Sequence, residues 1–161
     1  MGSPVARLRI IPMRGQHIDA VMEVERLAHK TPWARQVFVE ELHREWAHVD
    51  LVVAPQPGGE RVCAFCNYWL VHDEVHILNV ATHPDDRRKG HARRLLDHVL
   101  DFARRKGCRF VTLEVRKSNT GAQTLYESLG FKPIGVRPHY YADDGEDAIV
   151  MMLDLTPEAS A

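Results

Sequence analysis

The chain has 161 residues, of which 45% are hydrophobic and 27% charged, and its 21 Lys and Arg nearly balance its 22 Asp and Glu. This length and composition fit one globular domain over residues 1–161 with a single core. The charge balance gives no general field to hold a nucleic acid, and no apolar run approaches the roughly 20 residues of a membrane helix. We therefore expect no direct binding to nucleic acid or membrane.

The N-terminal residues and the cysteines bear on location and metal binding. Met1 to Ala6 lack the apolar stretch of a signal peptide, so a cytoplasmic location is expected.

Three cysteines are too few for a disulfide framework. Cys63 and Cys66 have the spacing of half a zinc site, but residues three apart on a strand point to opposite faces, and no second pair exists. We predict two buried small hydrophobes and no metal.

Strands and two helices are predicted in the first half of the chain. Apolar residues recur at helical spacing in two segments, whereas other segments are apolar runs separated by turns. The predicted helices are 16–29 and 34–46, and the predicted strands are 8–12, 50–54, 61–71 and 75–82. Both faces of the last strand are largely apolar, so we expect it in the middle of the sheet.

The second half begins with an amphipathic helix whose apolar stripe runs from Ala92 to Ala103 and which ends at Gly107. A strand over 110–115 follows, which implies a right-handed parallel crossover from strand 75–82.

A further helix is capped by Asn119 or by Thr120, which with Gln123 fits a capping box, and Gly130 ends it. The last predicted elements are strands 131–138 and 148–155. The expected fold class is mixed α/β, with a central mixed sheet of about six to seven strands flanked by about four helices.

A basic loop with a glycine lies between strand 75–82 and the amphipathic helix. It consists of Arg87, Arg88, Lys89, Gly90, His91 and Ala92. A helix start here offers unpaired backbone N–H groups to an anion, and Gly90 lets the backbone approach a phosphate closely. The alternative is a solvated basic turn. The glycine patterns of a P-loop and of a dinucleotide fold are both missing.

At this loop the sequence resembles the GNAT superfamily of N-acetyltransferases. The coenzyme A loop of that family has the form Arg/Gln-x-x-Gly-x-Gly/Ala, which Arg87, Gly90 and Ala92 match. Further segments resemble the ribosomal-protein-alanine acetyltransferases (the RimI type) in particular. These segments are 32–33, 78–84, 113–119, 125–131, 137–141 and 146–148.

The resemblance implies a GNAT-like acyl-CoA N-acyltransferase fold with acetyl-CoA as co-substrate. It implies that the basic loop holds the coenzyme pyrophosphate and that Asn119 also touches the coenzyme. The pantetheine arm would pair with backbone groups of Val80, Ala81 and Thr82. By likeness, Tyr140 and Tyr141 line the groove of the acceptor peptide, although two aromatics beside a strand are as often packing residues. The role of His91 is left open.

Two residues are candidates for acid and base chemistry. Alternation along strand 110–115 places Glu114 opposite the apolar face, at the C-terminal end of a parallel strand, where ligand crevices form. By resemblance, Glu114 is the general base that takes a proton from the amine, and Tyr126 is the general acid that protonates the leaving thiolate. From the residues alone, Glu114 fits an exposed strand carboxylate, and Tyr126 fits a core tyrosine on an apolar helix stripe.

The resemblance therefore implies transfer of acetyl to a protein N-terminal α-amine, with the N-terminal alanine of a ribosomal protein as acceptor. A second hypothesis is an acetyltransferase that uses the same coenzyme but acts on a lysine side chain or a small amine. A third hypothesis is a non-catalytic acyl-CoA-binding regulatory module. The presence of both Glu114 and Tyr126 favours an enzyme over such a module.

Overall fold

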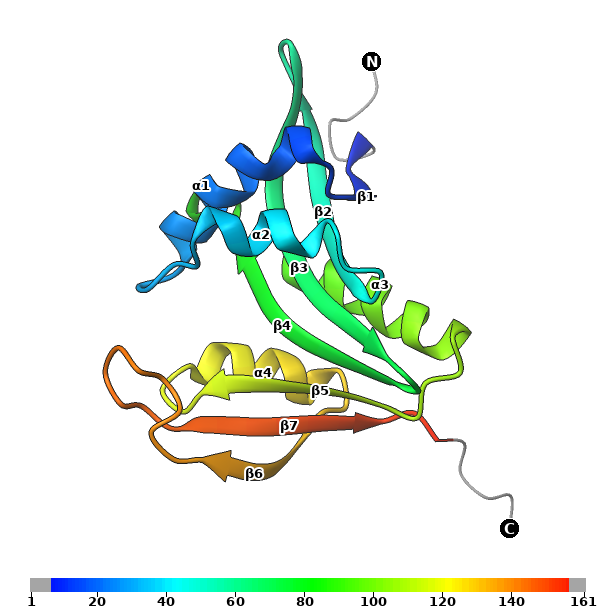
Figure 1. Ribbon diagram of the computed structural model, residues 1–161, viewed down its shortest axis with the longest axis vertical. Coiled ribbons are helices and arrows are strands. Elements are labelled where there is room, and N and C mark those ends of the chain that lie inside the picture. The colour runs from blue at the N-terminus through cyan, green and yellow to red at the C-terminus, as the bar shows by residue number, and fades with distance from the viewer. Residues whose placement is uncertain (1–6, 157–161) are drawn as a thin grey trace. The chain divides into compact units, whose positions relative to one another are not determined.

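The computed structural model describes residues 7–156 and has one seven-stranded mixed sheet with the order β1-β2-β3-β4-β5-β7-β6 (Figure 1). The strands are β1 (Arg9–Pro12), β2 (Ala47–Gln56), β3 (Gly59–Val71), β4 (Glu74–Thr82), β5 (Phe110–Arg116), β6 (Lys132–Arg137) and β7 (Ala148–Asp154). The helices are α1 (Ile18–Ala28), α2 (Arg35–Glu41), α3 (His91–Arg105) and α4 (Thr120–Ser128), with short 3-10 turns η2 (Gly15–His17) and η3 (Pro84–Asp86). The expected mixed α/β class is confirmed.

Two expectations concern the ends of the chain and the membrane. The residues on which the cytoplasmic expectation rests, Met1 to Ala6, lie outside the described part of the chain. Among residues 7–156, every helix is too short or too polar to cross a membrane.

Helix α2 is shorter than the sequence pattern predicts. It ends at Glu41, and turns occupy the residues from there to Ala47, where β2 begins opposite Trp69 of β3. Phe38 is fully buried, whereas Trp46 is 48% exposed. The prediction of a helix reaching Trp46 was therefore wrong, because the pairing of β2 with β3 takes the chain out of the helix first.

The centre of the sheet is a parallel pair, as predicted. Strand β4 is fourth of seven, and it pairs with β5 from Glu74 opposite Phe110 to Ile77 opposite Leu113. The connecting helix α3 ends where predicted: Gly107 has φ 72°, and Cys108 donates its N–H to the Ala103 carbonyl at 2.9 Å. This left-handed glycine closes the helix and turns the chain into β5.

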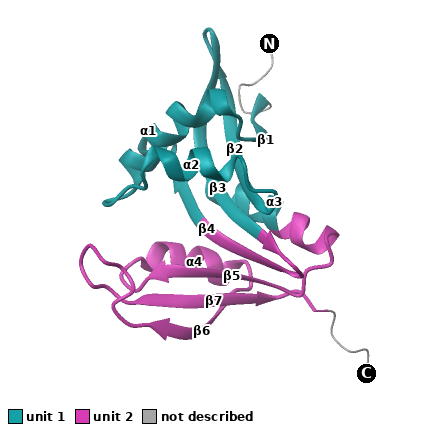
Figure 2. Cartoon of the chain, viewed as in Figure 1, with its two compact units in different colours: residues 1–69, 79–99 teal, residues 70–78, 100–161 magenta. Residues whose placement is uncertain are grey.

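The described chain falls into two compact units (Figure 2). Of the described residues, unit 1 comprises 7–69 and 79–99, and unit 2 comprises 70–78 and 100–156. In unit 1, α1 and α2 bury side chains such as Val21, Val24 and Phe38 against Leu51 and Phe65 of the sheet. In unit 2, the buried face of β5 alternates as predicted, with Val111, Leu113 and Val115 inward.

Gly130 makes a testable contribution to the stability of unit 2. It follows α4 with φ 103°, and an added Cβ would lie 2.9 Å from Leu153 Cδ1. We expect Gly130→Ala to lower the free energy of unfolding by about 2–3 kcal/mol, measured by urea denaturation, because backbone strain and overpacking add. Gly58→Ala is the control, since Gly58 has φ 80° with nothing within 4 Å. Equal losses at the two positions would contradict the role of Leu153.

Candidate active site

The predicted anion loop lies in unit 1 and joins η3 to α3. Gly90 has φ 79°, and its carbonyl accepts the Arg94 N–H at 3.0 Å, the first hydrogen bond of α3. Within residues 7–156, the backbone N–H groups of residues 88–92 have no acceptor in the protein. Exposed Arg87, Arg88 and Lys89 stand beside them. Amide hydrogens and cations therefore lie together in this loop, an arrangement that could bind an anion.

A part-buried ion pair braces the start of this loop. Both Nε and Nη2 of Arg61 on β3 donate to Asp86 Oδ2, at 3.1 and 2.7 Å, and Lys89 Nζ lies 3.5 Å from Asp86 Oδ1. Burial opposes the charge on Asp86, but the hydrogen bonds and positive charges of Arg61 and Lys89 together outweigh it and lower the pKa of this carboxyl below its usual range. No sequence pattern indicates this pair, because its residues are 25 positions apart along the chain.

His91 is the one residue of the predicted loop whose side chain is buried, at 4% exposure. Burial lowers the pKa of its imidazole. A contact with the coenzyme pyrophosphate would therefore come from the backbone N–H of His91 rather than from its ring.

The predicted pantetheine segment forms the end of β4. Ala81 is buried in the core of unit 1, and Val80 and Thr82 are partly exposed. All three residues follow the stretch of β4 that ends its pairing with β5 at Ile77.

A buried polar network beside this end of β4 was missed by sequence reasoning. Glu25, only 1% exposed on the apolar face of α1, accepts the Trp33 N–H and the Asn79 side-chain N–H, both at 2.8 Å. Asn79 Oδ1 lies 2.8 Å from His29 Nε2. The network ties the α1–α2 connection to β4. Its signal was a lone carboxylate within an apolar helix stripe.

The candidate base lies in unit 2. Glu114 is on the partly exposed face of β5, its side chain is 27% exposed, and its Oε1 lies 3.3 Å from Arg137 Nε of β6. It is neither fully exposed nor in the core, so it suits a carboxylate that meets a substrate.

Helix α4 carries the other two candidates of unit 2. Tyr126 is partly buried, with its ring centroid 5.9 Å from that of Phe131. Asn119 is the N-cap of α4, since its Oδ1 accepts the Ala122 N–H at 3.1 Å. The capping box predicted for Thr120 is absent, because Gln123 donates instead to backbone carbonyls of residues 116 and 117.

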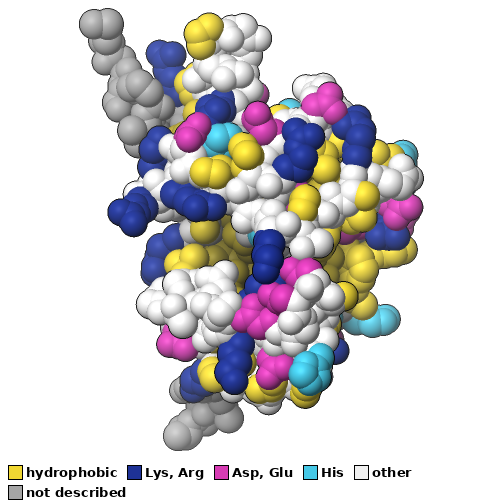
Figure 3. All heavy atoms as spheres, turned by 90° about the vertical axis from the view of Figure 1, so that its left-hand side faces the viewer, with side chains coloured by type: hydrophobic (Ala, Val, Ile, Leu, Met, Phe, Trp, Pro, Cys, Tyr) yellow, Lys and Arg dark blue, Asp and Glu magenta, His cyan; other side chains and the backbone are white. Residues whose placement is uncertain are grey.

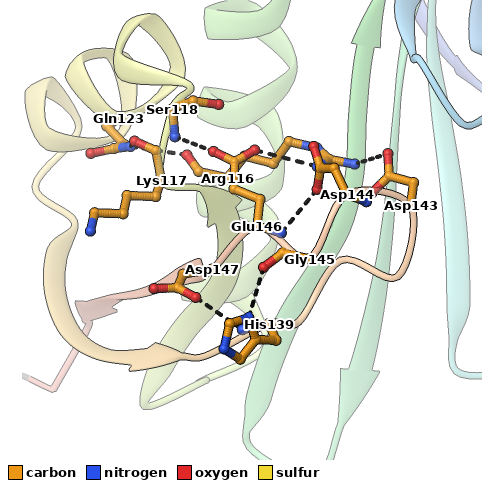
Figure 4. Close-up of polar contacts among 10 residues, drawn as sticks. All are labelled: Arg116, Lys117, Ser118, Gln123, His139, Asp143, Asp144, Gly145, Glu146 and Asp147. Carbon is orange, nitrogen blue, oxygen red and sulfur yellow. Dashed lines mark hydrogen bonds and ion pairs between the residues drawn. The ribbon is translucent and has the colours of Figure 1, made fainter.

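The loop between β6 and β7, residues 138–147, is fastened by one arginine at the end of β5 (Figure 4). Arg116 reaches Asp143 at 2.9 Å, Asp144 at 3.2 Å and Glu146 at 3.4 Å. Its guanidinium carbon also lies 4.0 Å from the ring centroid of Tyr141. The Arg116 side chain therefore has four partners in this loop, and it holds the segment that carries Tyr140 and Tyr141.

The two predicted aromatic residues differ in exposure. Tyr140 is 49% exposed, whereas Tyr141 is half-buried, and burial raises its pKa to about 12. Their rings meet edge to face at 5.1 Å. Tyr140 is therefore the more exposed of the two, and the Arg137 guanidinium carbon lies 5.7 Å from its ring centroid.

The charge on the surface is mixed. In Figure 3, Lys and Arg side chains are interspersed with Asp and Glu side chains over the face shown. This agrees with a formal net charge of −1. Attraction for an anionic ligand would therefore have to be local, and residues 87–89 are a run of three exposed cations.

A mixed sheet with a parallel central pair, whose connecting helix follows a basic glycine-containing loop, is the arrangement expected of an acyl-CoA N-acyltransferase fold. The profile of the Acetyltransferase (GNAT) family matches residues 18–131, and the chain belongs to this family. It is an acetyl-CoA-dependent N-acetyltransferase.

The most informative relatives act on a ribosomal protein. The chain is 36% identical over 141 residues to the "[Ribosomal protein bS18]-alanine N-acetyltransferase" of Escherichia coli (strain K12), covering 86% of this chain and 92% of that one. It is 32% identical over 143 residues to the enzyme of the same name from Haemophilus ducreyi, covering 87% and 95%. The crystal structure of the ribosomal-protein-S18-alanine N-acetyltransferase from Escherichia coli has a TM-score of 0.83 at 34% identity, covering 95% and 97%.

Gly90 provides a direct test of the anion loop. An added Cβ meets nothing within 4 Å, so Gly90→Ala strains the backbone at φ 79° without a clash. We expect the dissociation constant of acetyl-CoA to rise about tenfold, measured by calorimetry, because the Cβ would stand where a phosphate approaches. Gly58→Ala, with matching φ 80°, should cost the same roughly 1–2 kcal/mol of stability and leave coenzyme affinity unchanged. Unaltered affinity in Gly90→Ala would exclude this loop.

Proposed function

We propose that the enzyme acetylates the α-amine of a ribosomal protein that begins with alanine. The observation that carries this proposal is the 36% identity, over most of both chains, to the Escherichia coli enzyme of that specificity. An α-amine has a pKa of about 8, against about 10.4 for a lysine amine, so it loses its proton more readily at neutral pH. A ribosomal acceptor would also place the enzyme in the cytoplasm.

The coenzyme is assigned to the loop and strand end described above. The N–H groups of residues 88–92, with the cations of residues 87–89, would hold the pyrophosphate. Backbone groups of residues 80–82 would pair with the pantetheine arm. Asn119 would contact the coenzyme through its side-chain nitrogen, since its oxygen caps α4. The family match over residues 18–131 runs through both compact units and supports their acting as one acetyltransferase domain.

Glu114 and Tyr126 are assigned the proton transfers. The acceptor nitrogen attacks the thioester carbonyl carbon, a C–N bond forms, and the C–S bond breaks. Glu114 takes the proton that the amine loses, and the Tyr126 hydroxyl gives its proton to the departing sulfur. The products are the N-acetylated protein and free coenzyme A. Holding amine and thioester together would supply most of the acceleration.

Tyr126→Phe tests the acid. The ring contact with Phe131 is kept, so folding should be preserved while the donor hydroxyl is lost. We expect kcat to fall about 100-fold, with little change in the affinity for acetyl-CoA, measured by steady-state kinetics and calorimetry. An unchanged kcat would leave Tyr126 as a packing residue.

The acceptor is tested with synthetic peptides and mass spectrometry. A peptide starting with alanine and containing an internal lysine should be acetylated on its α-amine alone, and the same peptide with a blocked N-terminus should not react. Modification of the lysine, or of small amines only, would replace the proposed acceptor. Binding of acetyl-CoA without transfer to any of these amines would instead indicate a regulatory module.

A further inference from the structure

Three side chains with metal-binding atoms meet in unit 1, beneath the anion loop. They are Cys63 of β3, Asp86 at the end of η3 and His91 at the start of α3, and one ligand atom of each lies within 4.8 Å of the others. All three residues are buried, at 2%, 6% and 4% exposure. The sequence predicted no metal, because it offered only the Cys63 and Cys66 spacing, and Cys66 is not part of this cluster.

A β-bulge brings Cys63 into the cluster. Val52 of β2 stands opposite Ala64, but the next residue, Val53, stands opposite Val62, so Cys63 is the extra residue of β3. A bulge redirects a side chain and interrupts the ladder. The Cys63 carbonyl accepts the His83 N–H at 2.8 Å, which anchors the segment leading into η3. The cysteine is thus placed by two independent features of the backbone.

The donor set matches one class of ion. Thiolate sulfur, imidazole nitrogen and carboxylate oxygen are the ligands of Zn²⁺, and softer or harder ions prefer more uniform sets. A tetrahedral zinc ion with bonds of about 2.0–2.3 Å keeps its donors about 3.3–3.8 Å apart. The three ligand atoms here lie within 4.8 Å of one another, so a bound ion would draw them together into that range. The thiolate would supply a negative charge to the ion, and Asp86 would share its charge with Arg61 and Lys89.

The surroundings supply an outer shell. Arg61 donates two hydrogen bonds to Asp86 Oδ2, an arrangement that orients a ligating carboxylate. The Cys63 thiol donates to the Arg61 carbonyl at 3.9 Å, and a bound ion would have to displace this proton.

We propose that Cys63, Asp86 and His91 bind one zinc-type divalent cation, with a fourth position open to water. Two of the ligands flank residues 87–90, so the bound ion would fix both ends of the anion loop. The metal site is independent of the proposed acceptor and of the proposed catalytic residues.

The test uses tag-free protein stripped of metal by a chelator, because a polyhistidine tag binds the same ions. Titration with Zn²⁺ by competition calorimetry should show one site per chain. Titration with Co²⁺ should produce the near-ultraviolet charge-transfer absorption of a cobalt–thiolate bond. Both readouts are taken without coenzyme or acceptor, so they do not depend on acetyl transfer.

Variants decide which residues hold the ion. We expect Cys63→Ala and His91→Asn to weaken Zn²⁺ binding at least about 100-fold, and Cys63→Ala to abolish the thiolate band. Cys66→Ala is the matched control, a buried thiol on the same strand, and should change neither readout. Circular dichroism checks that each variant is folded. If Cys63→Ala does not fold, His91→Asn still tests the site.

Two outcomes would overturn the proposal. One is absence of a stoichiometric Zn²⁺ site in the wild-type chain, which would leave a packed thiol and imidazole beside the Arg61–Asp86 ion pair. The other is a site that survives in both Cys63→Ala and His91→Asn, which would place the ion elsewhere.

Discussion

Glu114→Gln should lower kcat by about 100- to 1,000-fold while leaving the dissociation constant of acetyl-CoA within about twofold of wild type. The amide keeps the shape of the side chain and cannot accept the amine proton. The loss should appear equally in kcat and in kcat/KM, because proton removal is needed only on the way to the transition state. Initial rates with an alanine-starting peptide, together with calorimetry of the coenzyme, measure both quantities.

A second carboxylate and the ion-pair partner sharpen this test. Glu127→Gln changes an exposed carboxylate on the next helix and should leave kcat unaltered. Arg137→Gln removes the cation 3.3 Å from Glu114 and should lower kcat far less than Glu114→Gln does. If Glu114→Gln and Glu127→Gln had the same small effect, Glu114 would be an ordinary strand carboxylate, the alternative that its position on β5 also allows.

The elements around the anion loop could be predicted because each depends on neighbouring residues. The apolar runs of β4 and β5, the stripe of α3 and the glycine at position 90 are local patterns, and the parallel crossover follows from their order. The half-exposed position of Glu114 follows from strand alternation alone. Its pairing with Arg137 does not, because that contact depends on the positions of β6 and β7.

Other features depend on the pairing of strands that are far apart in the chain. The register of such a pairing cannot be predicted from one sequence. The pairing of Ala47 with Trp69 ends α2 before the helical pattern runs out at Trp46. A bulge in β3 turns Cys63 toward Asp86. In both cases the register between two strands overrides a pattern that is correct in its own segment.

The arginine at position 116 shows the same dependence. It meets its three acidic partners because β7, the last strand in sequence, inserts between β5 and β6. The sequence alone shows only an arginine after a strand and a later acidic turn. No periodicity connects the two.

Arg116→Gln should raise the KM for the acceptor peptide about tenfold, with a smaller change in kcat. The variant loses the contact 4.0 Å from the Tyr141 ring and leaves Asp143, Asp144 and Glu146 without their shared cation. We expect the free energy of unfolding to fall by about 1–2 kcal/mol, since cation–π and partly exposed ionic contacts are individually modest. The loop with Tyr140 would then be ordered in fewer molecules of the free enzyme. Peptide binding would have to order it, which lowers the affinity for the peptide.

The pH dependence of this loop distinguishes positioning from mere stability. Hydrogen bonds from Ser118, followed by those from Arg116, lower the pKa of Glu146. A group with a lowered folded-state pKa stabilises the fold above its unfolded pKa, and this stabilisation disappears as the pH falls through the folded value. Arg116→Gln should therefore move the NMR titration of the Glu146 carboxyl to higher pH. Arg109→Gln, at the other end of β5 with one exposed partner, should move neither this titration nor the KM. An unchanged Glu146 titration in Arg116→Gln would mean that Ser118 alone holds the loop.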